Sequence, residues 1–99
     1  MQDSETKPTT LLFDLETTPL DQEDVSLHCL VILDYETGET TRYNDTGTAE
    51  PISRGVTYLM DADTIIGHNI IGFDIPMIKK VYPFFKPEGR IIDLSLIHI

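Results

Sequence analysis

Residues 11–16 read Leu-Leu-Phe-Asp-Leu-Glu, an apolar run that ends in two carboxylates with one residue between them. Residues two apart on a β-strand point to the same face, so Asp14 and Glu16 would lie side by side at the end of a buried strand. Two partly desolvated carboxylates repel each other unless a cation neutralises them. Ligand sets made only of oxygen select Mg²⁺ or Mn²⁺. The stretch therefore predicts a central strand that carries part of a metal site.

Composition limits the chain to one small domain, because it has 99 residues. The net charge of -10 argues against a nucleic-acid binder that works through a basic patch, but not against an enzyme that meets phosphates through bound metal. The single Cys29 cannot form an internal disulfide. No apolar stretch approaches the ~20 residues of a membrane span. We therefore expect no membrane partner and a cytoplasmic location, in the host cell if the chain is phage-encoded.

Hydrophobic patterning predicts three strands followed by alternating helices and strands, an order typical of an α/β mixed sheet flanked by helices. Pro76 is tolerated only in a first helical turn, so the second helix should begin near Phe73 or Asp74 and end at Pro83. Residues 1–8 are expected to be a disordered tail. The expected elements are strands at 10–16, 26–35 and 39–43, a short strand that leads into a polar loop at 64–69, a turn at 36–38, helices at 50–60 and 72–82, and a strand start or helix lead-in at 91–93.

The segment from Ile65 to Lys80 carries a third acidic residue in a suitable context. It is predicted to form a strand, a loop and a helix, with Asp74 in the first helical turn, where the helix dipole favours an acid. From there, Asp74 would project toward the end of the strand that carries Asp14 and Glu16. Asn69 lies in the loop and can hydrogen-bond a phosphate or a sugar. The three acids together suggest a metal-dependent phosphodiester site.

These residues resemble the motifs of the DEDD 3′→5′ exonucleases. F-D-L-E-T-T at 13–18 matches their first motif, Asp-x-Glu-Thr, and H-N-I-I-G-F-D at 68–74 matches their second, Asn-x-x-x-Phe/Tyr-Asp. The resemblance is closest to the proofreading domain of phage family A (Pol I-like) DNA polymerases, which also has a segment like L-H-C-L-V-I-L-D-Y-E-T-G-E between the motifs. It covers roughly residues 10–93 and implies a ribonuclease H-like fold.

The resemblance implies hydrolysis of the 3′-terminal phosphodiester of single-stranded DNA by a two-metal mechanism. In that mechanism, Asp14, Glu16 and Asp74 are the catalytic residues and the ligands of two Mg²⁺ or Mn²⁺ ions. Thr17 and Asn69 would contact the terminal nucleotide. Phe73 would pack against a base or support the start of the helix. The implied partners are a single-stranded DNA 3′ end and a polymerase domain of the same parent chain.

One feature of the family is missing from the sequence. The family needs a fourth carboxylate from a Tyr-x-x-x-Asp or His-x-x-x-x-Asp motif, and neither motif follows Asp74, while Asp93 comes too early. We therefore expect residues 9–93 to be a partial exonuclease domain, incomplete at its C-terminus and inactive alone.

The last six residues, Leu-Ser-Leu-Ile-His-Ile at 94–99, equal the in-frame translation of CTG TCT CTT ATA CAC ATC, the end of a transposon adaptor used in sequencing libraries. We interpret them as a non-native tail. A natural apolar segment is the open alternative.

Two other functions are compatible with these residues. A non-catalytic ribonuclease H-like module, serving in structure or binding, would fit the acidic charge and the missing fourth ligand. Another metal nuclease of the same fold, such as a resolvase-like enzyme, is the other alternative, although the Asn-x-x-x-Phe-Asp spacing argues against it.

Overall fold

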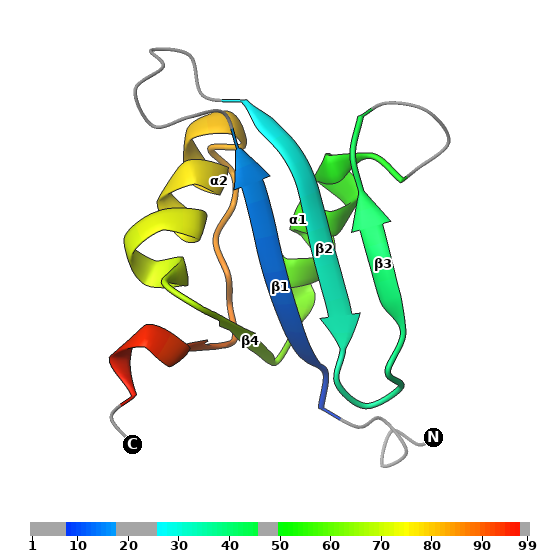
Figure 1. The fold of residues 1–99 in the computed structure, drawn as a ribbon, viewed down its shortest axis with the longest axis vertical. Helices are drawn as coiled ribbons and strands as arrows, with labels where there is room; N and C mark the ends of the chain where they lie inside the picture. Colours follow the sequence, from blue (N-terminus) through cyan, green and yellow to red (C-terminus); the bar gives the residue numbers. More distant parts are fainter. Residues whose placement is uncertain (1–7, 18–25, 46–49, 98–99) are drawn as a thin grey trace.

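The computed structural model describes residues 8–17, 26–45 and 50–97. Their strands form one sheet in the order β3-β2-β1-β4-β5, with β1 at its centre (Figure 1). The elements are β1 (Thr10–Thr17), β2 (Leu27–Asp34), β3 (Thr40–Tyr43), α1 (Ile52–Asp61), β4 (Thr64–Gly67), the π-helical turn η2 (Ile70–Asp74), α2 (Ile75–Val81), β5 (Arg90–Asp93) and the 3₁₀ turn η3 (Leu94–Leu96). The predicted disordered tail lies, apart from Pro8, outside the described residues.

The sheet is mixed, as the order of the elements predicted. β1 pairs antiparallel with β2 and parallel with β4. β2 continues antiparallel into β3, and β4 pairs parallel with β5. The turn between β2 and β3 ends at Gly38, whose φ of 78° suits a glycine. The predicted hairpin and the edge position of its second strand are therefore confirmed.

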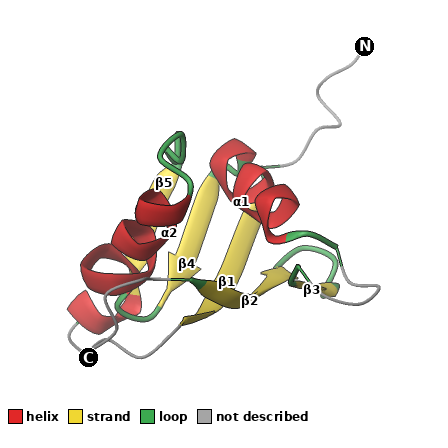
Figure 2. Ribbon diagram, turned by 90° about the horizontal axis from the view of Figure 1, so that it is seen from above, coloured by secondary structure: helices red, strands yellow, loops and turns green. Residues whose placement is uncertain are grey.

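Both α-helices lie on the same side of the sheet, as Figure 2 shows. Along β1, Leu11, Phe13 and Leu15 are buried in one cluster with the apolar residues of α1 and α2. The residues between them, Asp14 and Glu16 among them, point to the opposite side because successive strand side chains alternate. The two-residue period of the sequence thus places both acids on the face away from the helices.

Helix α1 approaches the sheet closely at Gly55. A Cβ atom there would lie 2.8 Å from Cδ2 of Leu30 and 2.9 Å from the ring of Tyr43. Gly55 is therefore required by packing, although a glycine lowers the intrinsic helix propensity of this segment.

Replacing Gly55 with Ala should destabilise the chain by about 1 kcal/mol. Overpacking of a well-filled core costs roughly 1–3 kcal/mol, and the better helix propensity of Ala returns up to about 1 kcal/mol of it. Urea unfolding would measure the change. The matched control is Ser53→Ala at an exposed position of the same helix, where we expect no loss. A Gly55→Ala variant that is more stable than the native chain would contradict this packing.

The second helix begins differently from the prediction. The sequence predicted a helix from about residue 72, whereas the structure has a π-helical turn at Ile70–Asp74 followed by an α-helix from Ile75. Pro76 has no N–H, and the turn before it is closed by the Ile75 amide, which donates to the Ile70 carbonyl. Asp74 is consequently the last residue of η2 and does not lie inside the first α-helical turn.

The segment at 91–93 forms the strand that was one of its two expected outcomes. β5 pairs with β4 from Arg90 to Asp93 and then leads into η3. Among the described residues, no helix is long and apolar enough to cross a lipid bilayer.

Candidate functional site

The first two predicted ligands lie on the open face of the sheet. Asp14 and Glu16 are both exposed, and Asp14 stands opposite Val31 of β2. A shallow hollow of about 190 Å³ lies beside Asp14 and is lined by Leu12, Phe13, Asp14, Val31 and Leu33. The sheet therefore presents Asp14 next to a small apolar depression.

Gly67 allows the chain to turn sharply from β4 toward the third predicted ligand. A Cβ atom at Gly67 would lie 3.1 Å from the carbonyl oxygen of Phe13 and would overlap the side chain of Ile70. The chain then passes through Asn69, which has a left-handed φ of 61°, into η2. Ile70 is fully buried in the core cluster that also contains Leu11 and Phe13 of β1, so η2 is anchored to the core. Figure 1 shows α2 continuing from there.

Asp74 is a buried acid at the end of this turn. Its exposed fraction is only 6 %. Burial raises the pKa of Asp74 from its ordinary value of 3.8 to about 6, and the nearby charges of Asp14 and then Asp93 push it the same way. Within the part of the chain that the structure describes, no hydrogen bond or ion pair supports the ionised Asp74 carboxylate. A cation would favour the ionised form, because it would remove the repulsion.

Asp14 and Asp74 are thus close enough for their charges to interact, although 60 positions separate them in the sequence. Glu16 is not among the groups that shift the pKa of Asp74. Among residues 8–17, 26–45 and 50–97, no three His, Cys, Asp or Glu side chains are grouped so as to hold one metal ion. The structure therefore places Asp14 and Asp74 within electrostatic range of each other, and the metal-binding roles of Asp14, Glu16 and Asp74 stay predictions.

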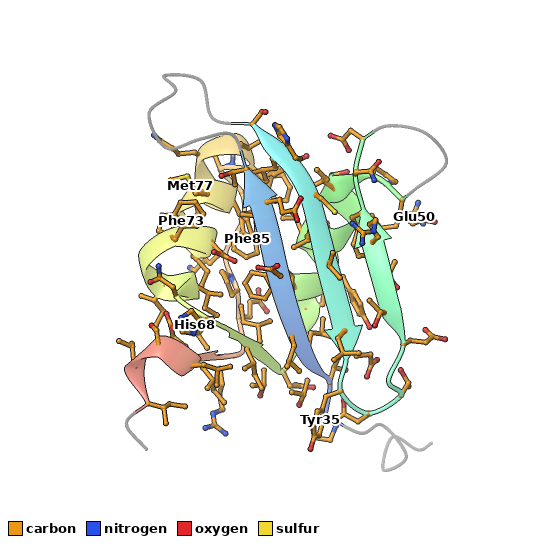
Figure 3. The ribbon with its side chains drawn as sticks, viewed as in Figure 1. Tyr35, Glu50, His68, Phe73, Met77 and Phe85 are labelled. Atoms are coloured by element: carbon orange, nitrogen blue, oxygen red, sulfur yellow. The ribbon has the colours of Figure 1, made fainter. Side chains whose placement is uncertain are left out.

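Two of the three predicted substrate-contacting residues, Asn69 and Phe73, lie in the same turn. Asn69 is exposed, and its side-chain oxygen lies close to Gly72, where a Cβ atom would be only 3.0 Å from it. Phe73 is half-buried, and its N–H donates to the Asn69 carbonyl over 3.1 Å. Figure 3 shows Phe73 with His68 and Met77 along the side where β4 leads into η2 and α2. Thr17 ends β1, just past a shift in its pairing with β2.

Asp93 is the residue of this region that the sequence did not single out. Its side chain is 5 % exposed. It accepts hydrogen bonds from the N–H groups of Asn69 at 2.8 Å, Ile71 at 2.9 Å and Ser95 at 3.0 Å, and from the Ser95 hydroxyl at 2.7 Å. Burial pushes the pKa of Asp93 upward, but these hydrogen bonds outweigh it and hold the pKa at about 2.

The local sequence indicated only part of this set of hydrogen bonds. An Asp followed two positions later by Ser is a common turn pattern, and the contact between Asp93 and Ser95 follows it. Nothing in the sequence indicates that Asp93 also meets Asn69 and Ile71, because parallel strand pairing between β4 and β5 brings these segments together.

Comparisons with known proteins agree with this architecture. The protein-family model of the RNase_H superfamily matches residues 11–98. A search of curated proteins found no match. Among solved structures, the chain is similar to the family B DNA polymerase from the hyperthermophilic archaeon Pyrobaculum calidifontis, with a TM-score of 0.67 and 22% identity over 90% of this chain. The match spans 16% of the polymerase chain, and the likeness is one of fold.

Proposed function

Because the chain belongs to the RNase H superfamily, we propose that it forms the N-terminal part of a metal-dependent 3′→5′ exonuclease domain of a DNA polymerase. The observation that carries the proposal is the proximity of Asp14 to a buried Asp74 whose pKa is raised to about 6. A buried carboxyl group near another carboxylate is unfavourable in a purely structural role, and such groups are typical of sites that hold metal or protons. Such a domain would act in the cytoplasm of the cell in which the DNA is replicated.

The polymerase context has two sources of support. The motifs around Asp14 and Asp74 resemble those of the proofreading domain of phage family A polymerases. The similar solved structure is a family B polymerase. Both likenesses point to a DNA polymerase, and the proposal rests on this shared context. The specific relationship to family A polymerases is the finer part of the proposal.

The carboxylates present fit a hard divalent cation. Asp14 and Asp74 offer oxygen donors, and Asp74 has no hydrogen-bond donor from the described residues to compete with a metal. These two residues, with Glu16 by the family pattern, would hold Mg²⁺ or Mn²⁺. Two such ions, when bound, would activate a water and stabilise the leaving 3′ oxygen.

The residues around the carboxylates would position the DNA. The exposed Asn69 amide can donate to or accept from the sugar and phosphate of a 3′-terminal nucleotide. Phe73, half-buried beside it, would support a base or hold the turn itself. Thr17 would contact the same nucleotide from the end of β1. Single-stranded DNA with a free 3′ end is therefore the proposed substrate.

The second candidate function is a non-catalytic structural or binding module of the same fold. Two observations favour it: no three-residue metal cluster occurs in the described part of the chain, and the net charge is -10. A module of this kind would leave DNA intact in the presence of any metal.

The deciding experiment uses the natural coding sequence that follows codon 93 in the source DNA. We expect a Tyr-x-x-x-Asp motif there, and we expect the protein that includes it to shorten 5′-labelled single-stranded DNA from its 3′ end in Mn²⁺. The 99-residue chain itself should trim little, because the fourth carboxylate is missing from its sequence. A longer protein that binds Mn²⁺ but leaves the DNA intact would favour the non-catalytic module.

A further inference from the structure

Asp93 joins two segments that are distant in the sequence. Its two carboxylate oxygens accept from the N–H groups of Asn69 and Ile71, which lie 24 and 22 positions earlier in the chain. Both amides belong to the short stretch that connects β4 to Asp74. A charged acceptor in a hydrogen bond makes a stronger contact than a neutral one. Asp93 is therefore an anionic clamp on the backbone just before Asp74.

The clamped stretch has an unusual backbone. Asn69 adopts φ 61°, a left-handed conformation that residues with a Cβ atom seldom adopt, although asparagine does so more readily than most. The next residues form a π-helical turn, which occurs rarely and often at functional sites. Such a backbone persists only where its surroundings hold it, and the two long-range hydrogen bonds to Asp93 meet it at Asn69 and Ile71.

We infer that Asp93 is a positioning residue, whose carboxylate holds the Asn69–Asp74 turn in the shape that keeps Asp74 beside Asp14. The inference deepens the proposed function and rests on it for the identity of the metal site. In this role, Asp93 acts on the site through the backbone of the turn.

The hydrogen bonds of Asp93 involve both of its carboxylate oxygens. An ionised carboxylate has about four lone-pair positions. Four donors already contact the Asp93 carboxylate, from Asn69, Ile71 and Ser95. Oδ1 accepts from Asn69 and twice from Ser95, whereas Oδ2 accepts from Ile71 alone and keeps a lone-pair position free. The Ser95 contacts lie within the segment interpreted as non-native, so the inference rests on the contacts with Asn69 and Ile71.

The proximity of the two buried acids agrees with this role. The charge of Asp93 is one of the causes that raise the pKa of Asp74. Asp93 therefore lies close to Asp74, the proposed metal ligand that it is inferred to position. A change at Asp93 should alter the surroundings of Asp74.

The test compares Asp93→Asn with a matched control, Asp34→Asn, in the 99-residue chain. Asp34 also accepts from two backbone N–H groups of a turn, those of Glu36 and Thr37, but in the loop between β2 and β3. Asp34 also accepts from the Tyr58 hydroxyl, as Asp93 does from the amide and hydroxyl of Ser95. Both substitutions turn a carboxylate that holds backbone amides of a turn into a neutral amide of the same shape. A general effect of losing such a contact should therefore appear in both variants.

Two measurements are made on each variant. Amide hydrogen exchange by NMR reports on Asn69 and Ile71, and on Phe73 and Ile75, whose N–H groups close the turn. Mn²⁺ titration reports on the proposed metal site. The affinity of the folded chain for Mn²⁺ does not change merely because the chain becomes less stable. We expect Asp93→Asn to speed exchange at these four amides and to weaken Mn²⁺ binding roughly tenfold, as changes to the partners of metal ligands do. Asp34→Asn should change neither.

Each contrary outcome has a distinct meaning. Unchanged exchange at the four amides in Asp93→Asn would refute the clamp. Faster exchange with unchanged Mn²⁺ affinity would show a structural role only and overturn the positioning role. A native chain that binds no Mn²⁺ would count against the proposed function, while the exchange at Phe73 and Ile75 would still decide whether Asp93 holds the turn.

Discussion

Asp14→Ala combined with Glu16→Ala is expected to lower 3′ trimming about a thousandfold in the protein that includes the sequence after codon 93. Metal ions contribute several kcal/mol of transition-state stabilisation in phosphodiester hydrolysis, and each 1.36 kcal/mol corresponds to about tenfold in rate. Both side chains are exposed on the open face of the sheet, so their removal should leave the core intact. The rate of shortening of 5′-labelled single-stranded DNA measures the effect.

The control for this pair is Asp61→Ala combined with Glu88→Ala. These two acids are also exposed, and their loss changes the net charge by the same amount. Removing negative charge should by itself help a chain with a net charge of -10 to approach DNA. We therefore expect the control to trim at least as fast as the native protein. Trimming that survives the loss of Asp14 and Glu16 would refute the metal-site assignment.

Asp74→Asn should make the metal-free chain more stable near neutral pH and should remove its response to Mn²⁺. The pKa of Asp74 is about 6 in the folded chain, against an ordinary value of 3.8. Between these two values the folded chain holds a proton that the unfolded chain has released, so the free energy of unfolding falls as the pH rises. Above the folded-state pKa of Asp74, the full loss in the free energy of unfolding is about 3 kcal/mol. A buried Asn amide lacks partners too, so we expect a net gain of about 1–2 kcal/mol.

Urea unfolding at about pH 5 and about pH 7.5 would test this, because the difference between the two should shrink in Asp74→Asn. Mn²⁺ should raise the melting temperature of the native chain, since a ligand of the folded state stabilises it, and should leave that of Asp74→Asn unchanged. Asp61→Asn, at an exposed position of α1, is the matched control and should behave like the native chain. Lower stability of Asp74→Asn at the higher pH would mean that the ionised carboxylate has a stabilising partner.

The sequence by itself determined the strand at the centre of the sheet and the side to which its acids point. In Leu11–Glu16, apolar residues that become buried on folding alternate with residues that remain more accessible to solvent. This two-residue period defines both the strand and its two faces. The hairpin at Gly38 and the break at Pro83 were predictable for the same reason, because their backbone requirements are local. The paired motifs also pointed to the superfamily that the comparison of residues 11–98 shows.

Only the tertiary structure decided how the turn before Asp74 is built and which groups surround that carboxylate. The π-helical turn at Ile70–Asp74 depends on the close contact of Gly67 with β1 and on the hydrogen bonds from Asn69 and Ile71 to Asp93. The burial of Asp74, its proximity to Asp14 and the clamp by Asp93 arise from the pairing of β1, β4 and β5. These contacts join residues 22 to 60 positions apart. Local propensity carries no information about such distances, since they are defined only when the chain packs into one core.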